Sequence, residues 1–111
     1  MSYSIVVSGE AIFDISGARL HLPSEIIKQT KLIQNSEQSY DEDSIEWLAT
    51  FEARVAGLVF RWVVQYTIGF TDSSLSDHEL VSSPPGAELT KNVGFELVEE
   101  EETLEEIYGR G

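Results

Sequence analysis

The chain has 111 residues, no cysteine and a formal net charge of -13, from 20 acidic and 7 basic residues. The missing cysteines exclude disulfides, thiol catalysis and cysteine-bound metals, and the charge argues against direct binding to nucleic acid or to an anionic membrane. The apolar fraction of 41% is enough for one core, so we expect a single domain over residues 1–111.

The N-terminal segment holds two short runs rich in β-branched residues, at 3–8 and 11–15, which predict one bent strand or a hairpin. The segment lacks the basic and long apolar regions of a secretory signal. No apolar run in the chain approaches the roughly 20 residues of a membrane span. We therefore expect a cytoplasmic protein that makes no contact with a membrane.

The residues after Pro23 predict one helix over about 24–35, because Ser24 can cap it and Glu25 lies in its first turn. The β-branched content of this stretch leaves a strand open as the alternative. The polar, acidic residues 34–44 that follow predict a loop.

Apolar and polar residues alternate through two consecutive runs, about 46–56 and 58–70, which predict the strands of a long central hairpin. The first run is longer than most strands, so we expect a bulge, a bend or a different start in it. The second is apolar on both faces in its middle, which predicts a central position in the sheet. Trp47 and Trp62 share the parity of the other apolar residues and are expected in the core.

The C-terminal part predicts a second loop over 72–90, a strand with one polar face near 92–97, and an acidic tail over about 99–111. Together these elements predict a mainly β (α+β) fold. We expect a single antiparallel sheet or a small sandwich of about four to six strands, with one helix.

Motifs for catalysis, metal binding or cofactor binding are absent from the sequence. His21 and His78 form no HxH or HExxH pattern, the acidic loops lack EF-hand spacing, and the glycines form no phosphate-binding motif. There is also no GxSxG serine elbow. We therefore expect no catalytic residue, no metal and no cofactor, and an enzyme is the least favoured class of function.

Two acidic stretches, 37–46 and 96–106, hold much of the negative charge, and a tyrosine accompanies each of them. Tyrosine is enriched at protein interfaces, and a tyrosine beside carboxylates suits a partner that presents Lys and Arg. A solvated surface that only aids solubility is the alternative. The candidate partner-binding residues are Glu37, Tyr40, Asp41, Glu42, Asp43, Glu99, Glu100, Glu101, Glu102, Glu105, Glu106 and Tyr108.

In its small size, single-domain organisation and strongly negative charge, the chain resembles the acidic immunity proteins of bacterial contact-dependent inhibition and colicin systems. The resemblance implies an inhibitor that neutralises a cognate basic toxin, most plausibly a nuclease, by covering its cationic active site. The expected partner is thus a basic protein, and a monomer is favoured. Two other functions remain open: a phage-type nucleic-acid mimic that blocks a CRISPR or restriction nuclease, and an acidic chaperone or assembly module.

Overall fold

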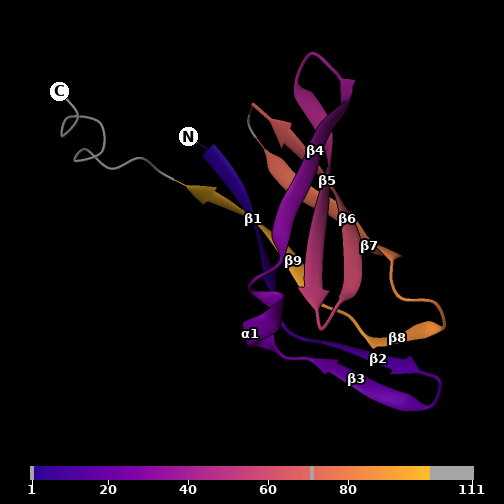
Figure 1. Cartoon of the computed structure of the whole chain (residues 1–111). Helices are drawn as coiled ribbons and strands as arrows, with labels where there is room; N and C mark the ends of the chain where they lie inside the picture. The colour runs from indigo at the N-terminus through magenta and orange to yellow at the C-terminus, as the bar shows by residue number, and fades with distance from the viewer. Residues whose placement is uncertain (1, 71, 101–111) are drawn as a thin grey trace.

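The protein is mainly β, as predicted, and its strands pair antiparallel (Figure 1). The computed structural model describes residues 2–70 and 72–100. Within these residues no helix is long and apolar enough to cross a membrane. In chain order the elements are β1 (Ser2–Ser8), β2 (Ala11–Ile15), β3 (Ala18–Leu22), α1 (Ser24–Ile27), β4 (Lys31–Tyr40), β5 (Ser44–Val55), β6 (Leu58–Gly69), β7 (Ser73–Ser82), β8 (Ala87–Lys91) and β9 (Gly94–Glu100).

A four-stranded sheet with the order β4-β5-β6-β7 contains the predicted central hairpin. The β5–β6 pairing confirms that prediction, since it runs without a break over all 12 residues of each strand. Ala56 and Gly57 at the turn have φ angles of 49° and 79°, the positive values that a two-residue hairpin turn requires. The irregularity expected in β5 lies instead in the two edge strands of the sheet, because the pairings of β4 and β7 each contain register shifts.

The predicted helix over about 24–35 is wrong beyond its first turn. Helix α1 spans only Ser24–Ile27, and Lys31–Tyr40 form strand β4, which extends into the predicted loop 34–44. The backbone groups of β4 form their hydrogen bonds with β5. The local pattern of residues 24–35 gives no sign of this partner, because β5 lies later in the chain. Because β4 is a polar strand at the edge of its sheet, it also lacks the apolar alternation by which strands are detected.

The predicted loop over 72–90 is also wrong, because strands β7 and β8 occupy most of it. β7 is an edge of the four-stranded sheet, and β8 is an edge of the three-stranded sheet β3-β2-β8. Edge strands expose much of their surface, so their sequences resemble those of loops. The described residues therefore form nine strands, more than the four to six predicted.

The two N-terminal runs are separate strands of different sheets, and the predictions of one bent strand or one hairpin are both wrong. β1 pairs with β9, whereas β2 pairs with β3 and β8. Gly9 lies between β1 and β2 with a φ of 84°, a conformation that residues with a side chain rarely adopt. The predicted strand near 92–97 is confirmed as β9.

Two hydrophobic clusters form the core. The first packs Phe13 of β2 and helix α1 against the fully buried Trp62 of β6, as predicted for that tryptophan. The second lies between the four-stranded sheet and the β1–β9 ribbon, where the rings of Phe51 and Phe95 are 5.3 Å apart. Trp47 is half-buried at the second cluster. The β4–β5 loop, whose residues 41–43 are exposed, projects at one end of the four-stranded sheet (Figure 1).

Candidate partner-binding site

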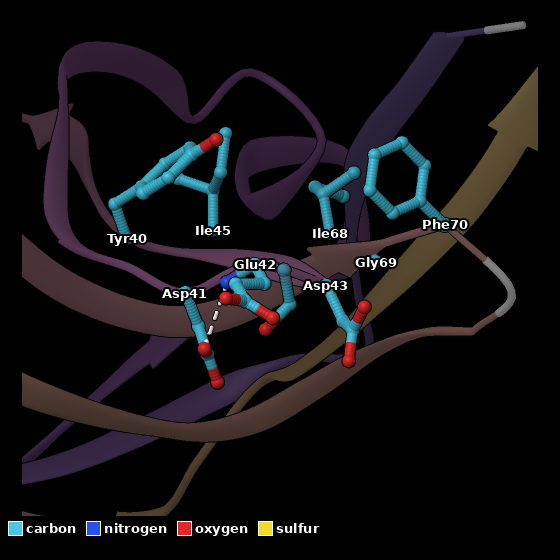
Figure 2. Close-up of a pocket in the computed structure, with 9 residues that line it drawn as sticks. Tyr40, Asp41, Glu42, Asp43, Ile45, Ile68, Gly69 and Phe70 are labelled. Atoms are coloured by element: carbon cyan, nitrogen blue, oxygen red, sulfur yellow. Dashed lines mark hydrogen bonds between the residues drawn. The ribbon is translucent and has the colours of Figure 1, made fainter.

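The β4–β5 loop and the end of β6 form a pocket at one end of the four-stranded sheet (Figure 2). Its volume is about 230 Å³. The loop contributes three consecutive acidic residues, and the flanking strands contribute aromatic and aliphatic side chains. The lining residues are Tyr40, Asp41, Glu42, Asp43, Ser44, Ile45, Ile68, Gly69 and Phe70.

Hydrogen bonds fix the loop and attach it to the end of β6. The Asp41 N–H donates to the Ser44 carbonyl at 2.8 Å, which closes the loop. The Phe70 N–H donates to the Asp43 carbonyl at 3.1 Å, which joins the loop to the neighbouring chain segment. The Glu42 N–H donates to Asp41 Oδ1 at 2.7 Å. The acidic loop is therefore held against β6 rather than extending into solvent.

Gly69 permits this close approach. A Cβ atom at that position would collide with the carbonyl oxygen of Asp72 and would lie 3.4 Å from the carbonyl oxygen of Asp43. The Gly69 N–H also donates to Ser73 Oγ at 3.3 Å. The β6–β7 connection can pack this tightly against residue 69 because that residue has no side chain.

The pocket has an apolar side and a carboxylate side. The aromatic and aliphatic side chains labelled in Figure 2 point together to one side of the loop, whereas Asp41 and Asp43 point to the other. Tyr40 is 74% exposed and Phe70 is 87% exposed. Such a surface suits a partner with several Lys or Arg side chains, since one can pack along the exposed rings and another can meet the carboxylates on the other side of the loop.

The three carboxylates of the loop form no ion pair with any Lys, Arg or His of the described residues. Glu52 on β5 shows the opposite situation. Its carboxylate lies 3.3 Å from Arg54 Nε and 3.1 Å from an Arg61 amino group. Hydrogen bonds from Arg54 and then Arg61 lower the pKa of Glu52 below its ordinary value, although desolvation opposes them. The charges of the loop carboxylates are therefore uncompensated within the described residues, whereas the charge of Glu52 is compensated by two arginines.

Glu10 is a second carboxylate held by cations of the same chain. Lys91 Nζ lies 2.8 Å and His21 Nε2 lies 2.7 Å from its oxygens. The hydrogen bond from Lys91, followed by that from His21, lowers the pKa of Glu10 to about 2 from an ordinary value of 4.5. These contacts tie the β1–β2 connection to both edge strands of the three-stranded sheet.

The structure brings four of the predicted residues together in the pocket, namely Tyr40 and the three acidic residues of the loop. Glu37 lies on β4 opposite Trp47, away from the pocket lining. Glu99 pairs with Tyr3 on β1, and the end of β9 is well separated from the β4–β5 loop (Figure 1). Glu100 ends β9, whereas Glu101, Glu102, Glu105, Glu106 and Tyr108 lie outside the described residues.

Ile45, Ile68 and Phe70 line the pocket but were not among the predicted site residues. All three continue the alternating apolar series of β5 and β6, so the sequence pattern treats them as core positions. One feature of the sequence could have marked Phe70 as a site residue: it ends the alternating apolar series of β6 and comes directly before a polar stretch. A large apolar residue at that point lies where the strand leaves the core.

Both histidines contact other residues of the same chain. His21 contacts Glu10, and His78 lies in β7 with Nε2 3.2 Å from the Val93 carbonyl oxygen and its ring against Phe95. Across residues 2–70 and 72–100, no three His, Asp or Glu side chains are grouped closely enough to hold a metal ion.

Comparison with known proteins gives no relative: no protein-family model matches the chain, and no curated protein or solved structure is significantly similar to it. The chemistry of the pocket is therefore the basis from which its ligand is inferred. That chemistry combines exposed aromatic rings with carboxylates that lack a cationic partner among the described residues.

Proposed function

We propose that this protein is a non-catalytic acidic inhibitor of a basic protein, specifically an immunity protein that neutralises a cognate basic toxin. A nuclease is the toxin class that fits best, because nuclease sites gather Lys and Arg to hold phosphate groups. The observation that carries the proposal is the pocket in which Tyr40 and Phe70 are exposed beside carboxylates that have no cationic partner in residues 2–70 and 72–100. In this proposal, the pocket receives a Lys or Arg side chain from the toxin's active site.

The composition of the pocket supports a protein partner with cationic side chains. Aromatic residues at the centre of an interface contribute a large share of the binding energy, and Tyr40 and Phe70 are placed to do so. The aliphatic part of a Lys or Arg side chain would cover these rings, and further Lys or Arg side chains of the partner would meet the carboxylates on the other side of the loop. A small neutral ligand would leave the loop carboxylates without compensation.

The charge of the whole chain supports rapid capture of such a partner. A net charge of -13 attracts a cationic protein over a long range and can raise association rates to about 10⁹ M⁻¹s⁻¹ at low salt. Rapid association is valuable to an inhibitor that must act before its toxin does. Binding should weaken steeply as salt rises, because salt screens this attraction.

The test is affinity capture from the source cell at low salt, with the wild type and the triple variant Asp41→Asn/Asp43→Asn/Phe70→Ala as baits. We expect a basic protein that the wild type retains and the variant loses. The matched control is the double variant Glu25→Gln/Glu88→Gln. It removes two charges from exposed positions on α1 and β8, so it should capture like the wild type.

The captured protein is then purified and its activity is titrated with the wild type. Loss of nuclease activity at one equivalent is the expected result. A partner that keeps full activity in the complex would contradict inhibition, and equal capture by the pocket variant would contradict the pocket as the binding site. Inhibition of DNA binding by several unrelated enzymes would instead identify a nucleic-acid mimic.

A further inference from the structure

Strand β4 leaves a long open edge on the four-stranded sheet. In the described part of the chain, its 10 residues pair with β5 on one side only, and all of them except Ser36 are exposed. Leu32 is 52% exposed and Ile33 is 47% exposed. An open edge presents N–H and C=O groups that can pair with a further strand, and apolar side chains along the edge favour such pairing.

The pairing of β4 with β5 determines which of its side chains share a face. Leu32 and Tyr40 are both opposite residues with the parity of the buried Phe51, so they lie on the face toward the β1–β9 ribbon. Lys31 is adjacent to Leu32 in the strand and lies on the opposite face. Asp41 points away from Tyr40 and therefore to the same side as Lys31 (Figure 2).

We propose that two copies of this chain pair antiparallel through β4, about a two-fold axis at Ser36. This register places Leu32 of one copy opposite Tyr40 of the second copy, so that an aliphatic side chain meets an aromatic ring on one face. On the other face it places Lys31 opposite Asp41 of the second copy, so that a cation meets a carboxylate. Both kinds of cross-strand pair are favourable, and two-fold symmetry makes each of them twice.

The charges of β4 are arranged so that this pairing is self-complementary. Lys31 is the one basic residue of the strand and lies at its first position, while the acidic loop follows its last position. Lys31 has no ion pair among the described residues, and Asp41 accepts only the short-range hydrogen bond from the Glu42 N–H. An antiparallel second copy supplies each of them with an opposite charge. A parallel copy would align like charges.

The symmetric contact uses the β4 edge of both copies, so association through this edge stops at a dimer. The two four-stranded sheets become continuous, and the two pockets lie at opposite ends of the β4 pair. Tyr40 and Asp41 of each pocket take part in this contact, whereas Asp43, Ile68 and Phe70 are not among the paired residues. This inference does not depend on the proposed inhibitory function.

Salt separates the two kinds of association. Each copy carries a net charge of -13, so two copies repel at low salt. That repulsion is screened as the Debye length falls from about 30 Å at 10 mM to about 8 Å at 150 mM salt, whereas backbone pairing and apolar contacts persist. Dimerisation should therefore strengthen between these salt concentrations, while capture of a cationic partner weakens.

The experiment is sedimentation equilibrium of the full chain at about 10 and 150 mM NaCl, over protein concentrations up to about 0.5 mM. We expect the mass to rise with concentration from 12.4 kDa toward twice that value at the higher salt. Lys31→Glu and Asp41→Lys should each weaken dimerisation about tenfold, because each converts two attractive pairs into repulsive ones. The double variant Lys31→Glu/Asp41→Lys has the wild-type net charge and should restore the dimer.

Lys28→Glu is the matched control, since it makes the same change in net charge as Lys31→Glu at the C-terminal end of α1. It should dimerise more tightly than Lys31→Glu, and circular dichroism would establish that every variant is folded. A monomer at all concentrations and both salt levels would overturn the proposal. Equal effects of Lys31→Glu and Lys28→Glu, or failure of the double variant to restore the dimer, would overturn the register.

Discussion

The two ends of the four-stranded sheet use the same residue types in opposite ways. Toward the β5–β6 turn, Phe60 is fully buried and the carboxylate of Glu52 is held by two arginines. At the other end, Phe70 is 87% exposed and the carboxylates of the β4–β5 loop have no cationic partner among the described residues. We call these the closed end and the open end.

The charges and rings of the closed end stabilise this fold, whereas those of the open end are available to a partner. A buried ring and a paired carboxylate already have their contacts within the chain. An exposed ring beside a carboxylate that lacks an ion pair can form contacts with another molecule. Composition does not distinguish the aromatic and acidic residues of the closed end from those of the open end. The two groups differ in where the strands place them.

The largest effect on stability should come from truncating an aromatic ring at the closed end. Phe60→Ala removes a fully buried ring from the first core cluster and should lower the free energy of unfolding by about 3–5 kcal/mol. Phe70→Ala, the same change at the open end, should stay within about 0.5 kcal/mol of the wild type. Urea unfolding measures both, and similar losses for the two variants would show that the ends do not differ.

A smaller loss is expected from Gly69→Ala, which disturbs the support of the open end. The added Cβ would collide with the Asp72 carbonyl, so the β6–β7 connection must move and the fold should lose about 1–3 kcal/mol. Gly94→Ala is the control, because a Cβ there lies 3.5 Å from Ser8 Oγ in ordinary contact. Chemical-shift changes confined to the pocket in Gly69→Ala would support this view, and a variant as stable as Gly94→Ala would contradict it.

The paired carboxylates should make stability depend on pH in a defined direction. The pKa of Glu10 is lowered from 4.5 to about 2 in the folded protein, so its stabilising effect is complete above about pH 4.5. That effect is lost as the pH falls toward about 2. We expect the free energy of unfolding to fall more steeply over this range in the wild type than in Glu10→Gln.

Urea unfolding at several pH values between these limits measures the difference, with Glu88→Gln as the control. Glu88 is an exposed acid on β8, and its removal changes the net charge by the same amount. Its profile should follow that of the wild type. Parallel profiles for the wild type and Glu10→Gln would mean that the contacts of Glu10 with Lys91 and His21 do not stabilise the fold.

The smallest effect on stability should come from neutralising the open end. Asp41→Asn/Asp43→Asn removes two negative charges that form no ion pair among the described residues, from a chain with net charge -13, so the thermal midpoint should stay equal or rise slightly. Glu52→Gln, which breaks contacts with Arg54 and Arg61, should lower it. A larger loss in the aspartate variant than in Glu52→Gln would show that the loop is a structural element.

The sequence predicted strands most reliably where the apolar alternation is long and the strand that pairs with them follows directly in the chain. The β5–β6 hairpin was predicted closely because both strands alternate over 12 residues and a two-residue turn joins them. Strands β3, β4, β7 and β8 were missed because they are polar edges, whose pairing depends on a neighbour rather than on their own pattern. Of the residues that line the candidate pocket, Tyr40 and the three acidic residues of the loop were proposed from composition, and Phe70 was not.

By itself the sequence determined the β-rich class of the fold, the central hairpin and the surplus of negative charge, because these follow from local alternation and from composition. Only the tertiary structure decided which charges are engaged and which remain open. Glu10 meets Lys91 across the three-stranded sheet, although the two residues lie 81 positions apart in the chain. The contact of Asp43 with the backbone of Phe70 likewise joins segments that are distant in sequence. Such contacts arise from the pairing of distant strands, and no pattern within a short stretch of sequence encodes them.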